Sequence, residues 1–432
     1  MRIAFKNFGC RANNFETDGL YLEAIRRGMM VVSDDEVADA YVINSCTVTA
    51  NADRDARNQV YRFKRANPSA VVAVIGCYAQ VAKEELLALS GVDYVVGTAD
   101  KIKVLDLIET AADGRDHVLA ATGYLPENFV GSRNARANIK IQDGCNYKCT
   151  FCTIPMARGR SRSLIPEVVE KQIAEAAAQG FQEVVLTGIH LAHYGWEHNS
   201  DLKGLLDRLL AKDGPRIRLS TLDPFEIPDG LLDLMATNSK LCPFLHIALQ
   251  SGDDEVLKRM RRVYKVIEFE SITEQIQKKV PHAYIGVDVI VGFPGETLEA
   301  FKRTVVVLEK THWSKLHVFS FSARKGTEAA KLDGKAPAQE IARRSAVLRE
   351  LSDRRNREFL LEQIGRTQEL LIERPSRKRP GRWLGHTESY VPVEFEGAGV
   401  AKQIVPVRLT SAMRSSVAGE LIPQFGCYQK PN

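Results

Sequence analysis

Three cysteines have the spacing of an iron-sulfur site. Cys145, Cys149 and Cys152 form a CxxxCxxC motif in the segment IKIQDGCNYKCTFC, directly after a predicted strand. Three thiolates on one loop can hold three irons of a 4Fe-4S cluster and leave the fourth iron free for an exogenous ligand. The alternative is a structural zinc site, which needs four ligands and usually a second Cys or His pair. No such pair is adjacent, so the motif favours the iron-sulfur cluster.

A second set of cysteines is spread over the first part of the chain. Cys10, Cys46 and Cys77 end the segments KNFGC, VINSC and VIGC, and each follows a predicted strand. In a parallel α/β sheet the loops after successive strands emerge at one edge, which can bring distant cysteines together. Spacing alone leaves open the alternative of three unrelated buried thiols, because free Cys often packs as a small core residue.

The elements that must position these cysteines alternate between strand and helix in the first 125 residues. We expect strands at 3–8, 40–44 and 71–76, and helices at 18–27, 52–65 and 83–89. This alternation predicts a small, largely parallel α/β domain over residues 1–125. The loop-like stretch 123–136 marks a domain boundary.

Residues 134–362 repeat the strand-then-helix cycle about six times. The expected strands lie at 138–142, 183–187, 217–220, 244–249, 284–291 and 315–320. The pattern predicts a partial (β/α)6 barrel, with its chemistry where the strands end. An Arg-rich helix at 339–363 leads to short strands at 369–373, 390–395 and 404–410. These strands predict a small β-barrel over residues 363–432.

Composition constrains the setting of this chemistry. Of the 432 residues, 44% are hydrophobic and 26% are charged, which is typical of a globular protein. No segment is apolar enough for a signal peptide or a membrane span, so we expect a cytoplasmic protein without a membrane partner. In a reducing compartment, cysteine clusters bind metals more often than they form disulfides. The net charge of +5 is too small to indicate a nucleic-acid partner by itself.

The CxxxCxxC motif at the end of a first barrel strand resembles the radical S-adenosylmethionine (SAM) superfamily. The resemblance implies that the open iron binds the methionine moiety of SAM, and that one electron splits SAM to a 5′-deoxyadenosyl radical. By analogy, the backbone at Thr187, Gly188 and Ile189 meets the methionine amino group. Further SAM-binding candidates near later strand ends are Gln250, Ser251 and Asp288. A plain loop or packing role remains an alternative for each of them.

The resemblance to one family of this superfamily, the methylthiotransferases, covers nearly the whole chain. Its N-terminal domain is matched by GCRANNFET at 9–17, ADAYVINSCTVTANADRDAR at 38–57 and GCYAQ at 76–80. Its barrel is matched by LTGIHLAHYG, LHIALQSGDDEVLKRMRRVY, VDVIVGFPGET and FSFSARKGTEAA, and its TRAM domain by the last strands. The resemblance implies that Cys10, Cys46 and Cys77 hold an auxiliary 4Fe-4S cluster, which carries the sulfur to be inserted. The enzyme would then contain two 4Fe-4S clusters, and all six cysteines would be catalytic.

The segments GCRANNFET and VINSCTVTANAD are most similar to the branch that acts on N6-threonylcarbamoyladenosine at position 37 of transfer RNA. The resemblance implies that one SAM methylates the sulfur, while a second SAM yields the radical that takes the hydrogen from carbon 2 of adenine. Sister branches act on isopentenyladenosine-37 or on an aspartate of a ribosomal protein, and these remain alternatives. The sequence departs from the family pattern at Asn7-Phe8, Asn14 and Arg324-Lys325.

The same resemblance implies three features of its partners. The substrate is a transfer-RNA anticodon stem-loop carrying threonylcarbamoyladenosine, the electron donor is a flavodoxin or ferredoxin, and the protein is a monomer. A dense basic run could bind RNA phosphates: Arg374, Arg377, Lys378, Arg379 and Arg382. Trp383 beside it could stack on a base. An Arg-rich face on the helix before it, at 343–357, is more typical of a solvated surface.

For two further groups of residues, the sequence does not favour metal binding. His190, His193 and His198 lie in HLAHYGWEH without a nearby Cys or an HExxH pattern, which favours a solvated or substrate-facing loop over a metal site. Cys242 has no partner at ligand spacing and is expected in the core, and Cys427 is left unassigned.

Overall fold

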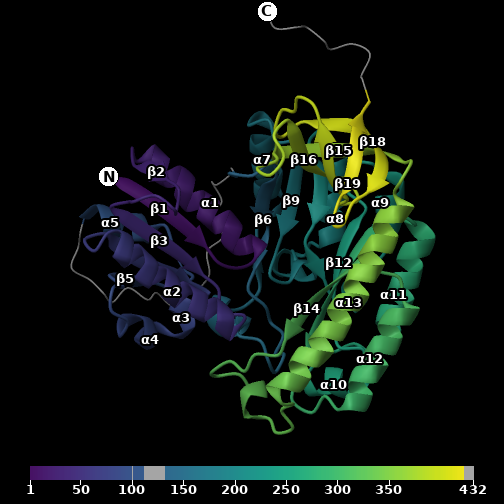
Figure 1. The fold of residues 1–432 in the computed structure, drawn as a ribbon, viewed down its shortest axis with the longest axis horizontal. Coiled ribbons are helices and arrows are strands. Elements are labelled where there is room, and N and C mark those ends of the chain that lie inside the picture. Colours follow the sequence, from purple (N-terminus) through teal and green to yellow (C-terminus); the bar gives the residue numbers. More distant parts are fainter. Residues whose placement is uncertain (100, 111–131, 423–432) are drawn as a thin grey trace, which may run out of the picture.

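The computed structural model describes residues 1–99, 101–110 and 132–422, which form three successive units (Figure 1). An α/β unit is followed by a larger α/β unit and then by an all-β unit. The predicted end of the first domain, at residue 125, and Cys427 lie outside the described residues. Within the described residues, no helix is both long enough and apolar enough to span a membrane.

The first unit is a parallel sheet in the order β2-β1-β3-β4-β5. Its elements are β1 (Arg2–Asn7), α1 (Arg11–Arg26), β2 (Met30–Val32), β3 (Ala40–Ser45), α2 (Ala50–Ala66), β4 (Val71–Gly76), α3 (Cys77–Val81), α4 (Lys83–Leu87), β5 (Tyr94–Val96) and α5 (Lys103–Thr110). Helices α1 and α5 cover one face, and α2, α3 and α4 cover the other. The central strand β3 is buried at every residue because both faces of the sheet are covered.

Helix α1 starts earlier than the sequence indicated. We expected a helix at 18–27, whereas α1 begins at Arg11, directly after Cys10. Its first turns carry Asn13, Glu16 and Asp18, which are polar and yet buried. An amphipathic pattern shows only the apolar stripe of a helix, so a face buried through hydrogen bonds and ion pairs escapes it.

The second unit is an open, partial barrel of parallel strands, in agreement with the predicted architecture. Its strands form two sheets, β10-β9-β6 and β11-β12-β13-β14, and only Ser220 separates β10 from β11 in the chain. The barrel strands are β6 (Ala137–Lys140), β9 (Glu183–Thr187), β10 (Arg216–Leu219), β11 (Thr221–Leu222), β12 (Phe244–Gln250), β13 (Tyr284–Val291) and β14 (Lys315–Ser320). A small hairpin, β7 (Gln142–Asp143) and β8 (Arg162–Ser163), flanks the first of them.

Helices cover the outside of this barrel. They are α6 (Ile154–Arg158), α7 (Pro166–Ala178), α8 (Leu202–Leu210), α9 (Leu231–Thr237), α10 (Asp254–Arg259), α11 (Val266–Lys279), α12 (Leu298–Lys310) and α13 (Ala338–Glu362), with 3-10 turns at Leu191–His193, Trp196–His198, Pro224–Glu226 and Ala329–Lys331. Helix α13 runs alongside the barrel and leads to the third unit (Figure 1).

The third unit is a closed five-stranded barrel in the order β15-β16-β17-β19-β18. Its strands are β15 (Thr367–Pro375), β16 (Arg382–Thr387), β17 (Pro392–Glu396), β18 (Ile404–Ala412) and β19 (Val417–Leu421). The sequence predicted β15, β17 and β18 but not β16 or β19. Those two strands contain Gly385 and Gly419, which interrupt the alternation of apolar and polar residues.

The third unit packs directly on the barrel. One apolar cluster joins Phe244 of β12 and Tyr284 of β13 to Leu370 and Val393 of the small barrel, and Cys242 lies in it. Cys242 is fully buried, as the sequence indicated. This contact places the hairpin that carries Tyr390 against the first residues of β12 and β13.

Candidate functional site

The first set of cysteines converges at one edge of the N-terminal sheet. Cys10, Cys46 and Cys77 follow β1, β3 and β4, which are neighbours in the sheet. Gly9 has a φ of +130°, and a Cβ on it would lie 2.8 Å from the Cβ of Cys46, so the first two loops touch. Burial, reinforced by the charges of Cys77 and Cys10, raises the pKa of Cys46 to about 12. The three thiols therefore lie within electrostatic reach of one another.

The second set lies on the loop between β7 and α6. Gly144 precedes it with a φ of +71°, and a Cβ there would come within 2.1 Å of the carbonyl oxygen of Arg160. Only glycine fits at this position without moving the loop. Burial is the main cause that raises the pKa of Cys152 to about 12, and the charges of Cys149 and Cys145 add to it. A metal that binds these thiols must therefore displace their protons.

Two side chains contact this loop from later segments: Arg262 from the turn after α10, and His190 from the loop after β9. Arg262 Nη1 donates to Cys149 Sγ over 3.3 Å, and Arg262 also pairs with Asp223. On the other side, His190 Nδ1 lies 3.6 Å from Cys145 Sγ. Both contacts come from residues distant in sequence, so the folded barrel holds the cysteine loop in place.

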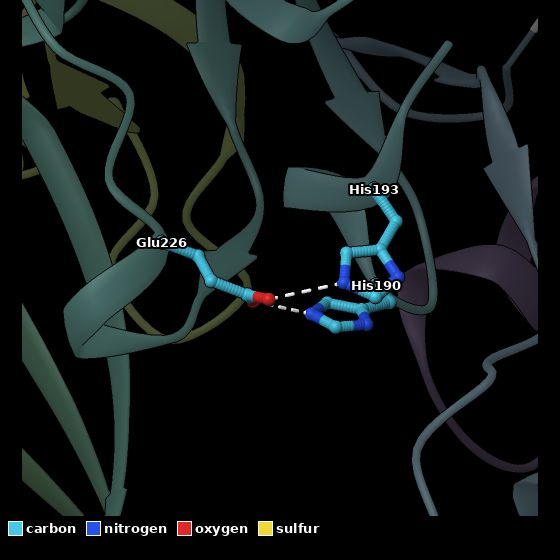
Figure 2. A group of neighbouring side chains, drawn as sticks. All are labelled: His190, His193 and Glu226. Carbon is cyan, nitrogen blue, oxygen red and sulfur yellow. Dashed lines mark hydrogen bonds and ion pairs between the residues drawn. The ribbon is translucent and has the colours of Figure 1, made fainter. Parts of the chain in front are cut away.

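Figure 2 shows His190 and His193 side by side, both facing the carboxylate of Glu226. The Nε2 atom of His190 lies 2.5 Å from one oxygen of Glu226, and that of His193 lies 3.0 Å from the other. Tyr147 donates its hydroxyl to the same carboxylate. Burial opposes a charge on His190, but its hydrogen bonds to Cys145 and Glu226 outweigh burial and raise its pKa to about 9.

The cluster of His190, His193 and Glu226 changes how these histidines are interpreted. A solvated or substrate-facing loop was expected for His190, His193 and His198. His198 is exposed, whereas His190 and His193 are only 6% and 1% exposed, and His190 lines a large cavity. The nitrogens of His190 and His193 and the Glu226 oxygens are close enough to hold a metal ion. The two Nε2 atoms already pair with the Glu226 oxygens, however, while His193 Nδ1 is buried without a hydrogen-bond partner. We therefore interpret the cluster as a structural support that holds His190 in position beside Cys145.

One large cavity joins the two cysteine sets. Its volume is about 790 Å³, and its lining includes Cys10 from the first unit and Cys145, Cys149 and Cys152 from the second. Cys46 and Cys77 are buried behind Cys10. The lining also includes five of the six residues that the sequence indicated for SAM: Thr187, Gly188, Ile189, Gln250 and Asp288.

The sixth of these residues, Ser251, differs. It is 1% exposed, does not line the cavity, and its hydroxyl has no hydrogen-bond partner. Its neighbour Gln250 lines the cavity with a φ of +63°, a backbone conformation that is rare for side-chain-bearing residues and is often found at functional sites. Asp288 accepts a hydrogen bond from His246 Nε2 over 2.8 Å.

Gln142 links two loops at the strand ends, a role that the sequence did not predict. Its side-chain oxygen accepts from the backbone of His190 over 2.7 Å, and its amide donates to the carbonyl of Gly144 over 2.9 Å. It thus links the loop after β9 to the loop that carries Cys145. An isolated Gln at the end of a predicted strand has no distinguishing sequence signal.

A buried charge network joins the first unit to the barrel behind the cavity. Glu16 of α1 meets Lys140 at 2.7 Å, Lys101 at 2.5 Å and Arg158 at 2.8 Å, and Arg158 also meets Asp143 at 3.1 Å. All five side chains are 0–1% exposed. Among the residues that the structure describes, three buried cations and two buried carboxylates thus meet in one network.

This network lies beside the first cysteine set. Arg158 ends helix α6, which packs against α3, the helix that Cys77 begins. Burial opposes the charge of Arg158, yet Cys77, Glu16 and Asp143 together raise its pKa. Positive charge near a group of thiols favours their deprotonated, metal-binding form.

The far end of the cavity is aromatic and cationic. Phe244, Tyr284 and Tyr390 contact one another, with ring centroids 4.9–5.8 Å apart. Arg11 reaches this cluster from the N-terminal unit, and its guanidinium lies 5.7 Å from the Phe244 ring. Burial is the main cause that lowers the pKa of Arg11. All three units therefore contribute to this end of the cavity.

The donor set fits iron-sulfur clusters in both places. The Cys145 set provides three thiols on one loop that lines the cavity, so a fourth iron would face the space where a ligand can bind. The Cys10 set provides three thiols beside the buried cations Arg158 and Lys101, which suits a cluster of thiolate ligands. Cys242 is far from both in the chain and packs in an apolar cluster.

The basic run of the third unit lies on the hairpin between β15 and β16. Arg374, Arg377, Lys378 and Arg379 are exposed, and they line a second hollow together with Arg414. Trp383, which the sequence suggested as a stacking surface, is half-buried against the barrel core. On α13, Arg344 is buried and paired with Glu296, whereas Arg343, Arg349, Arg354 and Arg357 are exposed. Both basic surfaces are therefore accessible, and the hairpin differs from α13 in lining a hollow.

Known families and relatives match the chain over almost its whole length. Residues 2–97 match the Uncharacterized protein family UPF0004, residues 139–308 the Radical SAM superfamily and residues 361–422 the TRAM domain. The chain is 38% identical to the "Threonylcarbamoyladenosine tRNA methylthiotransferase MtaB" of Aquifex aeolicus, over 94% of this chain and 100% of that protein. The protein of the same name from Bacillus subtilis is 35% identical, over 95% and 94%.

More distant relatives carry a different name. The "tRNA-2-methylthio-N(6)-dimethylallyladenosine synthase" of Symbiobacterium thermophilum is 29% identical, over 98% of this chain and 94% of that protein. Among solved structures, the radical S-adenosylmethionine methyltransferase TsrM of Kitasatospora setae superposes with a TM-score of 0.53. It is 16% identical and covers 74% of this chain and 72% of its own, a likeness that concerns the fold alone.

Proposed function

The chain belongs to the radical SAM methylthiotransferase family, and we propose that it converts N6-threonylcarbamoyladenosine in transfer RNA to its 2-methylthio derivative. One structural observation supports this most directly: Cys10 and the Cys145 loop line the same cavity. Sulfur insertion and hydrogen removal must act on one carbon atom, so both centres must reach one substrate.

The cysteines have two distinct roles in this proposal. Cys145, Cys149 and Cys152 would hold a 4Fe-4S cluster, which supplies the electron that cleaves SAM to a 5′-deoxyadenosyl radical. Cys10, Cys46 and Cys77 would hold a second 4Fe-4S cluster, which carries the sulfur. Carbon 2 of adenine bears a hydrogen that no side-chain base removes at a useful rate, which is why the reaction requires a radical.

The surrounding residues bind and orient the reactants. Thr187, Gly188 and Ile189 present their backbone to the methionine end of SAM, and Gln250 and Asp288 contact it from later strands. Ser251 is excluded from direct contact because it does not line the cavity. Arg262 donates to Cys149 Sγ, His190 Nδ1 lies beside Cys145 Sγ, and both contacts hold the loop in place.

The partner is the anticodon stem-loop of a cytoplasmic transfer RNA. An unpaired loop base can be splayed into a cavity, whereas a base in a duplex cannot reach it. The exposed hairpin of the third unit binds the phosphates and so positions the RNA. A flavodoxin or ferredoxin supplies the electrons, and the enzyme acts as a monomer.

The test uses reconstituted full-length protein under anaerobic conditions with SAM and reductant. The substrates are transfer RNA carrying threonylcarbamoyladenosine, transfer RNA carrying dimethylallyladenosine, and unmodified transfer RNA. Nucleoside analysis is expected to show the 2-methylthio product only with the first. A product with the second alone would assign the chain to the sister branch, and 5′-deoxyadenosine without any modified nucleoside would contradict a transfer-RNA substrate.

A further inference from the structure

Three guanidinium groups lie around the aromatic cluster at the far end of the cavity, those of Arg11, Arg136 and Arg218. Two of them are paired with carboxylates. Arg136 and Arg218 lie 5.6 Å and 4.9 Å from the Tyr390 ring, and both pair with the buried carboxylate of Glu183. Arg136 also pairs with Glu373. The protein therefore provides an internal anion for each of these two cations.

Arg11 is the exception. It has no carboxylate partner among the described residues, and its Nη1 atom is buried without a hydrogen bond. Its interaction with the Tyr390 hydroxyl does not supply a full negative charge. A guanidinium group that is largely removed from water without a carboxylate partner is costly, and the cost falls when an anion binds to it. Because Arg11 lines the cavity, an anionic ligand can reach it.

Within the described part of the chain, the cavity lining does not provide this anion. It includes two carboxylates, Asp223 and Asp288, which pair with Arg262 and His246. It also includes Lys315, which is exposed and adds a further positive charge at the same end. This part of the site therefore carries an excess of positive charge that a neutral purine ring does not require.

The proposed substrate carries a suitable anion. The threonylcarbamoyl group on N6 ends in a carboxylate and a hydroxyl, whereas a dimethylallyl group is uncharged. Carbon 2 and the N6 substituent flank N1 of the same ring, so a residue that recognises the substituent must lie near the sulfur site. Arg11 directly follows Cys10, and its planar guanidinium matches a carboxylate with two parallel hydrogen bonds.

We infer that Arg11 binds the carboxylate of the threonylcarbamoyl group and thereby selects this nucleoside over adenosines with an uncharged N6 substituent. The inference rests on the proposed function and assigns to one residue the specificity of that site. Lys315 strengthens the local positive potential, and the aromatic rings of Phe244 and Tyr390 provide the apolar walls around the pair. Charged recognition in a partly dehydrated pocket discriminates strongly against ligands that lack the charge.

The test alters the charge on each side of the contact in turn. Equilibrium binding is measured for anticodon stem-loops with threonylcarbamoyladenosine, its methyl ester, or dimethylallyladenosine. Wild-type protein is expected to bind the acid about 10- to 100-fold more tightly than the ester. Arg11→Gln is expected to bind the acid and the ester equally, and Arg11→Lys is expected to retain part of the preference. The ester measurement needs no variant, so it remains decisive if Arg11→Gln folds poorly.

Arg26→Gln is the matched control, because it removes the same charge from the exposed end of the same helix, roughly 22 Å from Arg11. It is expected to retain the full preference. Equal binding of acid and ester by wild-type protein, or an unchanged preference in Arg11→Gln, would overturn the inference. Neither result affects the proposed function, which depends on turnover of the threonylcarbamoylated transfer RNA by wild-type enzyme.

Discussion

The carboxylate of Glu16 on α1 lies 2.7 Å from the ammonium group of Lys140 on β6, and both side chains are fully buried. Burial alone would raise the pKa of Glu16, but Arg158, Lys101 and Lys140 hold it well below its ordinary value. This ion pair ties the unit that carries Cys10 to the barrel that carries Cys145. Buried ion pairs therefore hold the first unit against the barrel.

Replacing Glu16 with Gln should destabilise the protein strongly. Lys101, Lys140 and Arg158 would then lose the carboxylate that they share, and removing one partner from a buried ion pair typically costs about 3–5 kcal/mol. Urea unfolding of the protein without metal measures the change. Glu36→Gln is the control, because Glu36 pairs with Arg2 at an exposed site and should cost less than about 1 kcal/mol. Equal losses in the two variants would show that the buried network does not stabilise the interface.

Single cysteine substitutions should separate the two centres. Cys46→Ala should reduce bound iron from about eight to about four per chain and abolish sulfur insertion, while 5′-deoxyadenosine is still formed from SAM. Cys149→Ala should also lose about four irons, but should form no 5′-deoxyadenosine. Iron assays and product analysis measure these outcomes. Cys242→Ala is the matched control and should retain all the iron, and a loss of iron there would show that Cys242 is a ligand.

The contact between barrel and third unit should weaken in acid. Burial alone would raise the pKa of Glu373, but His386 and Arg136 lower it to about 2, below its ordinary value of 4.5. A lowered pKa in the folded state means that the stabilisation is complete above pH 4.5 and is lost as the pH falls towards 2. The shift corresponds to roughly 3 kcal/mol.

Glu373→Gln should therefore be less stable than the wild type at pH 6, and the difference should shrink as the pH is lowered from 4.5 to 3. Urea unfolding at each pH, monitored by tryptophan fluorescence, measures it. A difference that stays constant over this range would show that the ionised carboxylate is not the source of the stabilisation.

Substitutions in the exposed hairpin should weaken RNA binding without changing nucleoside preference. Arg377→Gln and Lys378→Gln each remove one phosphate contact, so each should lower the slope of log affinity against log salt concentration by about 1. Arg349→Gln on the exposed face of α13 tests the alternative basic surface and should leave the slope unchanged. A loss of slope in Arg349→Gln alone would assign RNA binding to α13 instead.

The sequence by itself determined the chemistry and most of the scaffold. The CxxxCxxC motif of Cys145, Cys149 and Cys152 is local in the chain, so its spacing could be interpreted before the fold was known. Strands β4, β9, β13 and β14 have the bounds that the sequence predicted. Buried parallel strands are continuous apolar runs between breakers, and that pattern is local.

Only the tertiary structure decided which polar residues meet. Glu16 and Lys140 are separated by 124 positions in the chain, and their ion pair exists only because α1 packs against β6. The same packing leaves Arg11 without a carboxylate while Arg136 and Arg218 share Glu183. A sequence records which residues are charged. Whether a charged side chain has a partner of opposite charge depends on the neighbours that folding brings together from distant segments.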